Sequence, residues 1–117
     1  MRLIARVIGN LEHLKVKHYE GLPPDLTAGK DLRKEMKAPA VVVIEDHRDG
    51  VFLYRYDAEA NCVGDTWHQD LDEAKDQAWF EFESILSEWV EIPLSIQGVH
   101  QVVQFGLSLF LDKTSGQ

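Results

Sequence analysis

The feature that most constrains the fold is a set of three short apolar or aromatic runs, separated by turn signals, in residues 40–67. Residues 40–46 (AVVVIED) form a continuous β-branched run, which is typical of a strand buried on both faces. The Asp-Gly pair in HRDG (47–50) favours a tight hairpin and leads into VFLYRYD (51–57). A second turn (AEAN, 58–61) leads into CVGDTW (62–67). The sequence therefore predicts a three-stranded antiparallel meander.

The middle strand of this meander divides its side chains between the two faces of the sheet. Alternation along a strand predicts three aromatic rings on one face and three other side chains on the opposite face: Phe52, Tyr54 and Tyr56 against Val51, Leu53 and Arg55. Tyr54 and Tyr56 resemble a platform on which bases could stack, but that mode needs a basic surround and this one is acidic.

A helix is predicted directly after the meander. Asp70 suits the N-cap and Glu73 stands three residues later, as in a capping box. Apolar residues then recur at three- and four-residue steps: Leu71, Ala74, Ala78, Phe82, Ile85 and Trp89. This spacing predicts one long amphipathic helix over 70–91, ending before Pro93, with a solvated ridge of carboxylates that includes Glu81 and Glu83.

The two ends of the chain are less regular. Residues 2–8 and 11–19 are predicted to pair as a hairpin, although 11–19 also fits a short helix. Residues 21–30 form a Pro- and Gly-rich loop, and 31–37 one or two helical turns. For 94–112 we expect a final strand that completes the sheet or pairs across a dimer, with a short helix around 99–105 as the alternative. Gly98 and Gly106 argue against one long helix there.

Together these elements predict a single α+β domain over residues 1–117. It consists of a small, mainly antiparallel sheet, made of a hairpin plus a three-stranded meander, with one long amphipathic helix packed on it. The segments are the N-terminal hairpin and loop (1–39), the meander (40–67), the helix (70–91) and the C-terminal segment (94–112). A chain of 117 residues can bury a real core without disulfides.

Charge is distributed unevenly along the chain, whose net charge is −8. Residues 1–39 carry 8 Lys/Arg against 5 Asp/Glu, whereas residues 40–117 carry 4 against 15. A phosphate backbone would be repelled by the second part, which argues against nucleic acid as the main partner. An acidic surface instead suits a basic protein partner steered by charge.

Motifs for catalysis, metal binding or membrane insertion do not stand out. The sequence shows no signal peptide or transmembrane run, so we expect a cytoplasmic protein without a membrane role. The lone Cys62 cannot form an internal disulfide, and five scattered histidines do not have metal-ligand spacing. No nucleophile elbow, P-loop or dinucleotide fingerprint is present, so we expect neither a cofactor nor an enzyme.

The stretch GDTWHQDLDEAK (64–75) concentrates polar and aromatic groups. Asp65, Thr66 and His68 stand too close in sequence to be assumed to converge as a triad. Turn, sheet packing, cap and first helical turn explain most of the stretch. The candidate contacts with a ligand or partner are Tyr54, Arg55, Asp65, Trp67 and His68. Phe105 and Phe110 are the candidates for self-association.

Residues 45–83 resemble a class of small uncharacterised bacterial proteins with the pattern DGxxLxRYDxxGxxxGDTWHxxLxEAxxQAxxEF. That resemblance implies no activity. Ala60-Asn61 departs from it, because a turn glycine is expected there. Gly64, Asp65, Thr66, Glu73 and Ala74 are also similar to antitoxins of the HicB type, which implies a small sheet domain that binds a toxin partner. Compared with the HicB-type pattern, residues 67–70 lengthen the gap between Thr66 and the helix. No DNA-binding segment follows the helix.

The function expected from the sequence is a non-enzymatic interaction or regulatory module. It would act through its sheet edge, acidic helix and C-terminal segment, on a basic partner or on a second copy of itself. One alternative is a small-molecule-binding or minor hydrolytic domain that uses Tyr54, Arg55, Asp65 and His68 in one pocket. The other is a HicB-like antitoxin domain that lacks a DNA-binding segment.

Overall fold

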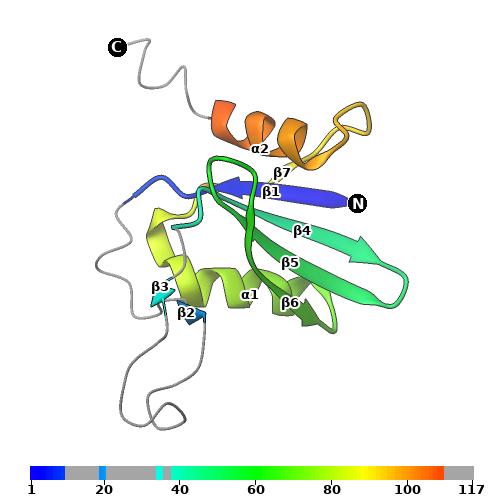
Figure 1. Cartoon of the computed structure of the whole chain (residues 1–117). Coiled ribbons are helices and arrows are strands. Elements are labelled where there is room, and N and C mark those ends of the chain that lie inside the picture. The colour runs from blue at the N-terminus through cyan, green and yellow to red at the C-terminus, as the bar shows by residue number, and fades with distance from the viewer. Residues whose placement is uncertain (10–18, 21–33, 36–37, 110–117) are drawn as a thin grey trace, which may run out of the picture.

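A five-stranded antiparallel sheet forms the centre of the protein. The computed structural model describes residues 1–9, 19–20, 34–35 and 38–109. The strand order is β6-β5-β4-β1-β7 (Figure 1). The strands are β1 (Arg2–Arg6), β4 (Val41–His47), β5 (Gly50–Tyr56), β6 (Cys62–His68) and β7 (Val90–Glu91). Two further short strands, β2 (Tyr19–Glu20) and β3 (Lys34–Glu35), pair with each other.

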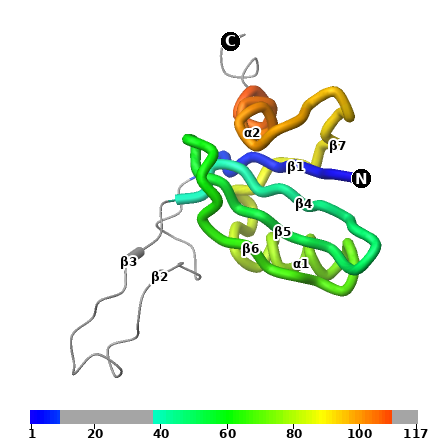
Figure 2. The backbone as a smooth tube through the Cα atoms, turned by 45° about the vertical axis from the view of Figure 1, so that its right-hand side comes forward, coloured from blue at the N-terminus to red at the C-terminus, as the bar shows by residue number. Residues whose placement is uncertain are grey.

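Two helices cover opposite faces of this sheet, as Figures 1 and 2 show. They are α1 (Leu71–Phe82), which is followed by a 3-10 turn η3 (Glu83–Ile85), and α2 (Val99–Ser108). Because both faces are covered, the central strand β4 is apolar throughout its first four residues, all of which are buried. The predicted meander and the α+β class are confirmed.

Each face of the sheet carries its own hydrophobic core. On the α1 side, strand residues such as Val42, Ile44 and Leu53 pack against Ala74, Ala78 and Phe82 of the helix. On the α2 side, Ile4, Val41 and Val43 pack against Val102 and Val103. The alternation predicted for residues 51–56 is confirmed, because Leu53 belongs to the first core and Tyr56 to the second.

The N-terminal strand differs from the predicted hairpin in its neighbours. β1 pairs with β4 along its whole length and with β7 at Leu3 and Ile4, and Val7 forms a bridge with Leu86. Both edges of residues 2–7 are therefore occupied by distant segments. Residues 11–18 lie outside the described part of the chain. Residues 34–35, expected in a helical turn, form β3.

The first helix begins as predicted and ends earlier. The Asp70 side chain accepts a hydrogen bond from the Glu73 amide at 2.8 Å, so the N-cap is confirmed. The prediction of a helix to residue 91 is wrong, because α1 ends at Phe82 and Glu83 adopts a φ of 51°. The chain after η3 extends along β1 instead and forms β7.

Val99–Ser108 of the C-terminal segment form the helix α2, so the expected final strand is wrong and the alternative of a short helix around 99–105 is confirmed. Gly98, with a φ of 80°, is the N-cap of α2. Gly106 faces the sheet, where an added Cβ would lie 2.5 Å from Ile4 Cδ1. The two glycines therefore start the helix and allow its close approach to the sheet, rather than interrupting it. The edge position expected for this segment is taken by β7.

The turn between β5 and β6 is tied by a buried carboxylate. Asp57 accepts hydrogen bonds from the Glu59 and Asn61 amides, each at 2.9 Å. Within this turn Ala60 has a φ of 68°, in the left-handed region that favours glycine. This is the position at which the sequence pattern quoted above has its turn glycine.

Replacing Ala60 by glycine is therefore expected to raise the free energy of unfolding by about 0.5–1 kcal/mol, since the left-handed strain exceeds the entropic cost of glycine. Chemical denaturation would measure the change. Ala58→Gly in the same turn, at a residue without positive φ, is the matched control and should destabilise slightly. Equal effects of the two substitutions would contradict the argument.

Candidate functional site

The five residues predicted to contact a ligand or partner lie on two different faces of the sheet. In the β5–β6 register Tyr54 pairs with Asp65 and Phe52 with Trp67, which places these side chains on the α2 side. Arg55 and His68 belong to the alternate positions, under α1. The structure therefore brings together Tyr54, Asp65 and Trp67, and separately Arg55 and His68. The five do not line one pocket.

Under α1, Arg55 and Glu81 form a buried ion pair. Arg55 is 1 % exposed and Glu81 is 2 % exposed. Nε of Arg55 donates to Glu81 Oε1 at 2.7 Å, and Nη2 donates to Glu81 Oε2. Nη1 donates to the Leu53 carbonyl at 3.2 Å, and Gln77 Nε2 donates to Glu81 Oε2 at 2.7 Å. Glu81 is thus a core residue, and its assignment to the solvated carboxylate ridge is wrong.

The same network continues along β6 to the start of α1. Arg55 Nη2 donates to Thr66 Oγ1 at 3.3 Å, and that hydroxyl lies 2.7 Å from His68 Nε2. His68 Nδ1 lies 3.3 Å from Glu73 Oε1. No buried side-chain nitrogen or oxygen among the described residues lacks a hydrogen-bond partner. These groups therefore hold α1 on the sheet, and their hydrogen bonds are made within the protein.

The opposite face carries a row of aromatic rings along β5. The centroids of Phe52 and Tyr54 lie 6.0 Å apart, and those of Tyr54 and Tyr56 6.1 Å apart, in stacked orientation. His47 meets Phe52 edge-on at 5.5 Å. Phe52 and Tyr54 are half-buried and only Tyr56 is buried. We call His47, Phe52, Tyr54 and Tyr56, with the adjacent Trp67, the aromatic face.

Trp67 is fixed at one end of the aromatic face. Its indole N–H donates to the Asp49 carbonyl at 3.2 Å. The ring also fills the space beside Gly50, where an added Cβ would lie 2.0 Å from the indole nitrogen. Even so, 53 % of Trp67 is exposed. Trp67 therefore adds exposed apolar surface to the half-buried rings of Phe52 and Tyr54.

Carboxylates give the aromatic face a negative electrostatic potential. Burial, followed by the charges of Glu45 and Asp65, raises the pKa of Tyr54. Burial and nearby negative charges also raise the pKa of Tyr56, to about 12. Both hydroxyls are therefore neutral at physiological pH, and the surface favours a cation over an anion.

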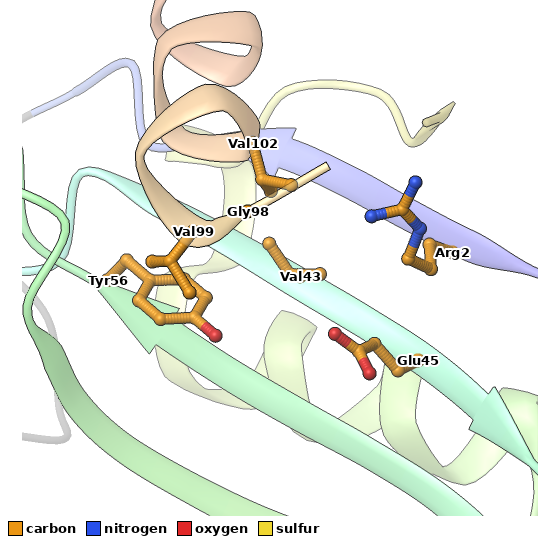
Figure 3. A pocket seen from close by; sticks show the side chains of 7 residues that line it. All are labelled: Arg2, Val43, Glu45, Tyr56, Gly98, Val99 and Val102. Atoms are coloured by element: carbon orange, nitrogen blue, oxygen red, sulfur yellow. The ribbon is translucent and has the colours of Figure 1, made fainter. Parts of the chain in front are cut away.

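A small cavity lies between the start of α2 and the sheet (Figure 3). Its volume is about 130 Å³, and its lining combines polar groups of Arg2, Glu45 and Tyr56 with Val43, Gly98, Val99 and Val102. Arg2 and Glu45 are not among the site residues predicted from the sequence. They are 43 residues apart in sequence and meet only because β1 pairs with β4.

Of the two residues expected to mediate self-association, Phe105 lies in the C-terminal helix. Phe105 of α2 is half-buried and lines an open apolar hollow of about 420 Å³ with Ile96, His100, Gln101 and Gln104. Phe110 lies outside the described residues. Self-association through this surface stays a prediction.

One sequence signal groups the residues of the buried network. All six polar members stand at specified positions of the quoted pattern: Arg55, Thr66, His68, Glu73, Gln77 and Glu81. Helical spacing alone could not find this network, because it assigns Glu81 to the solvated ridge of carboxylates.

Comparisons with known proteins found no match to this chain among family models, curated proteins or solved structures. The resemblances to the bacterial class and to HicB-type antitoxins stay predictions. In the ranges that the structure describes, no three His, Cys, Asp or Glu side chains gather as metal ligands. No helix of these ranges has the length and apolar character to cross a membrane.

Proposed function

We propose that this protein is a non-enzymatic interaction module whose aromatic face binds a basic, extended segment of a partner protein. The observation that carries the proposal is the row of stacked rings on β5, lying between the carboxylates of Glu45 and Asp65. A ring face attracts a Lys or Arg side chain, and the attraction grows where neighbouring carboxylates add their charge.

The spacing of the rings specifies the form of the partner. Adjacent ring centroids along β5 are 6.0 and 6.1 Å apart. Alternate side chains of an extended segment recur at about 6.6 Å, since a strand rises about 3.3 Å per residue. Cationic side chains at every second position would therefore meet successive rings. The preferred partner segment has Arg or Lys at alternating positions.

The charge of the domain supports a basic partner. Among the described ranges, residues 38–109 contain three Lys or Arg and fourteen Asp or Glu. One of the three cations, Arg55, is buried in its ion pair with Glu81. A cationic segment is therefore attracted over a distance set by the ionic strength, and its association rate falls as salt rises.

The test compares two peptides of equal length and composition, one with alternating Arg and Ser and one with Arg and Ser in separate blocks. The alternating peptide is expected to bind tighter. Tyr54→Ala is expected to weaken that binding about tenfold, which corresponds to about 1.4 kcal/mol of cation–π and contact energy. Isothermal titration calorimetry at two salt concentrations measures both effects.

Trp79→Ala is the matched control. Trp79 is 59 % exposed and belongs to α1, on the other side of the sheet, so its loss should leave peptide affinity unchanged. Equal affinity for both peptides, or equal weakening by Tyr54→Ala and Trp79→Ala, would show that binding depends on net charge alone and would remove the aromatic face as the site.

A further inference from the structure

The cavity beneath the start of α2 has the size of a very small ligand. Its volume is about 130 Å³. A cavity of about 150 Å³ holds benzene, which has six heavy atoms. Larger metabolites and drug-sized molecules need about 300 Å³ or more. A ligand that fills this cavity therefore has about six heavy atoms.

Arg2 places a fixed positive charge at one side of the cavity. Its Nη2 donates to the carbonyls of Pro93 at 3.1 Å and Ile96 at 2.6 Å, which holds the guanidinium beside the segment that precedes α2. Both bonds use the same nitrogen. Among the described residues, Nε and Nη1 make no hydrogen bond, so they can donate to a ligand carboxylate.

The N-terminus of α2 also borders the cavity. Gly98 is the N-cap and offers no side chain, and Gly98 and Val99 both line the cavity. The first N–H groups of a helix lack intrahelical partners and carry partial positive charge. Gln101 Oε1 accepts from the Gln97 amide, one residue before the cap, at 3.1 Å. An anionic group therefore fits between Arg2 and this helix start.

Glu45 and Tyr56 supply the opposite polarity. Glu45 Oε1 lies 3.0 Å from His47 Nε2, and Oε2 has no partner within the described ranges. Tyr56 is only 8 % exposed, and its hydroxyl points into the cavity without a hydrogen bond to any described residue (Figure 3). Since no buried side-chain oxygen of the described residues lacks a partner, this hydroxyl is open to the cavity, where it can bond a ligand. A carboxylate and a hydroxyl oxygen both accept from an ammonium group.

We propose that this cavity binds a small zwitterionic α-amino acid of the size of alanine or serine. The carboxylate lies between Arg2 and the N-terminus of α2, and the ammonium group lies between Glu45 and the Tyr56 hydroxyl. The short side chain packs against Val43 and Val102. This site lies beside the aromatic face and shares Tyr56 with it, while Glu45 borders both. Its ligand is a free amino acid and not a basic peptide.

The charge arrangement separates this ligand from its simpler relatives. Propionate retains the carboxylate but would meet Glu45 without a compensating ammonium group. Ethylamine retains the ammonium group but would lie near Arg2 without a carboxylate. Only a molecule with both charges compensates both sides of the cavity.

Calorimetric titration of the full chain with L-alanine, L-serine, propionate and ethylamine at millimolar concentrations tests the proposal. Saturable binding of the two amino acids is expected, with no binding of propionate or ethylamine. Tyr56→Phe keeps the ring and removes the hydroxyl, and should weaken L-alanine binding about fivefold, as expected for one hydrogen bond. Val99→Phe fills the cavity and should abolish binding.

Two outcomes would overturn the inference. One is a lack of binding by L-alanine and L-serine to the native protein. The other is unchanged L-alanine binding by both the Tyr56→Phe and the Val99→Phe variants. Circular dichroism would verify that both variants are folded. Trp79→Ala, an exposed substitution on α1, is the control that should keep native affinity. Because no peptide is present, failure here leaves the proposed binding of a basic segment untouched.

Discussion

Replacing Glu81 by leucine is expected to destabilise the protein by about 3–5 kcal/mol, because it leaves the Arg55 charge buried without a counter-ion. Arg55 is 1 % exposed and donates two hydrogen bonds to the Glu81 carboxylate, so the folded state has no water to replace that partner. Since many domains of this size have a total stability of about 5–15 kcal/mol, the variant should be close to unfolding. Urea denaturation followed by circular dichroism measures the loss.

The double substitution Arg55→Met with Glu81→Leu tests the reason for that loss. It removes both charges and should recover most of the lost stability, because an apolar pair of similar volume can replace a buried ion pair. Asp76→Leu, at an exposed position of the same helix, should change the free energy of unfolding by less than about 0.5 kcal/mol. If the double variant were no more stable than Glu81→Leu alone, the unpaired charge would not be the cause.

Replacing Gly106 by valine is expected to cost about 1–3 kcal/mol or more, because α2 would have to move away from the sheet. An added Cβ would lie 2.5 Å from Ile4 Cδ1 and 2.8 Å from Val41 Cγ1. Both neighbours are fully buried in the core on that face, so neither can turn aside without displacing others. Thermal unfolding and urea denaturation should both show the loss.

Gln104→Val serves as the matched substitution, since Gln104 is an exposed residue of α2 and gains the same β-branched side chain. Its stability should change by less than about 0.5 kcal/mol. Gly106→Ala should fall between the two, because a single methyl group meets the same atoms with fewer contacts. Equal stability of Gly106→Val and Gln104→Val would mean that α2 does not require the close approach seen at Gly106.

The meander could be predicted from sequence because its signals are local. Alternation along residues 51–56 assigns Arg55 to the face of Leu53, and the structure confirms that face. The sequence cannot show that Arg55 is shielded from water on that face, because the shielding depends on how the helix that carries Glu81 packs across β5. The Arg55–Glu81 contact joins residues 26 positions apart, and helical spacing counts Glu81 as a solvent-facing acid.

The errors at the ends of the chain arise from non-local pairing. The apolar residues Ile85 and Trp89 continue the predicted helical stripe, yet they reach the same core from the 3-10 turn η3 and from the non-helical chain before β7. In the sequence, the two glycines at α2 look like interruptions of a helix. Gly106 is explained only by the close packing of α2 on the sheet. The cavity was beyond prediction for the same reason, because Arg2, Tyr56 and Val99 come from three separate elements.

The position of β1 between β4 and β7 has a consequence for the order of folding. The meander and α1 are built from contacts between near neighbours in sequence, so they can form early at low loop-closure cost. β1 precedes both of its neighbours in the chain: it pairs with β4, more than thirty residues later, and with β7 near residue 90. β1 is thus among the last strands of this sheet to gain both neighbours, and completion of the sheet depends on pairing between segments far apart in the sequence.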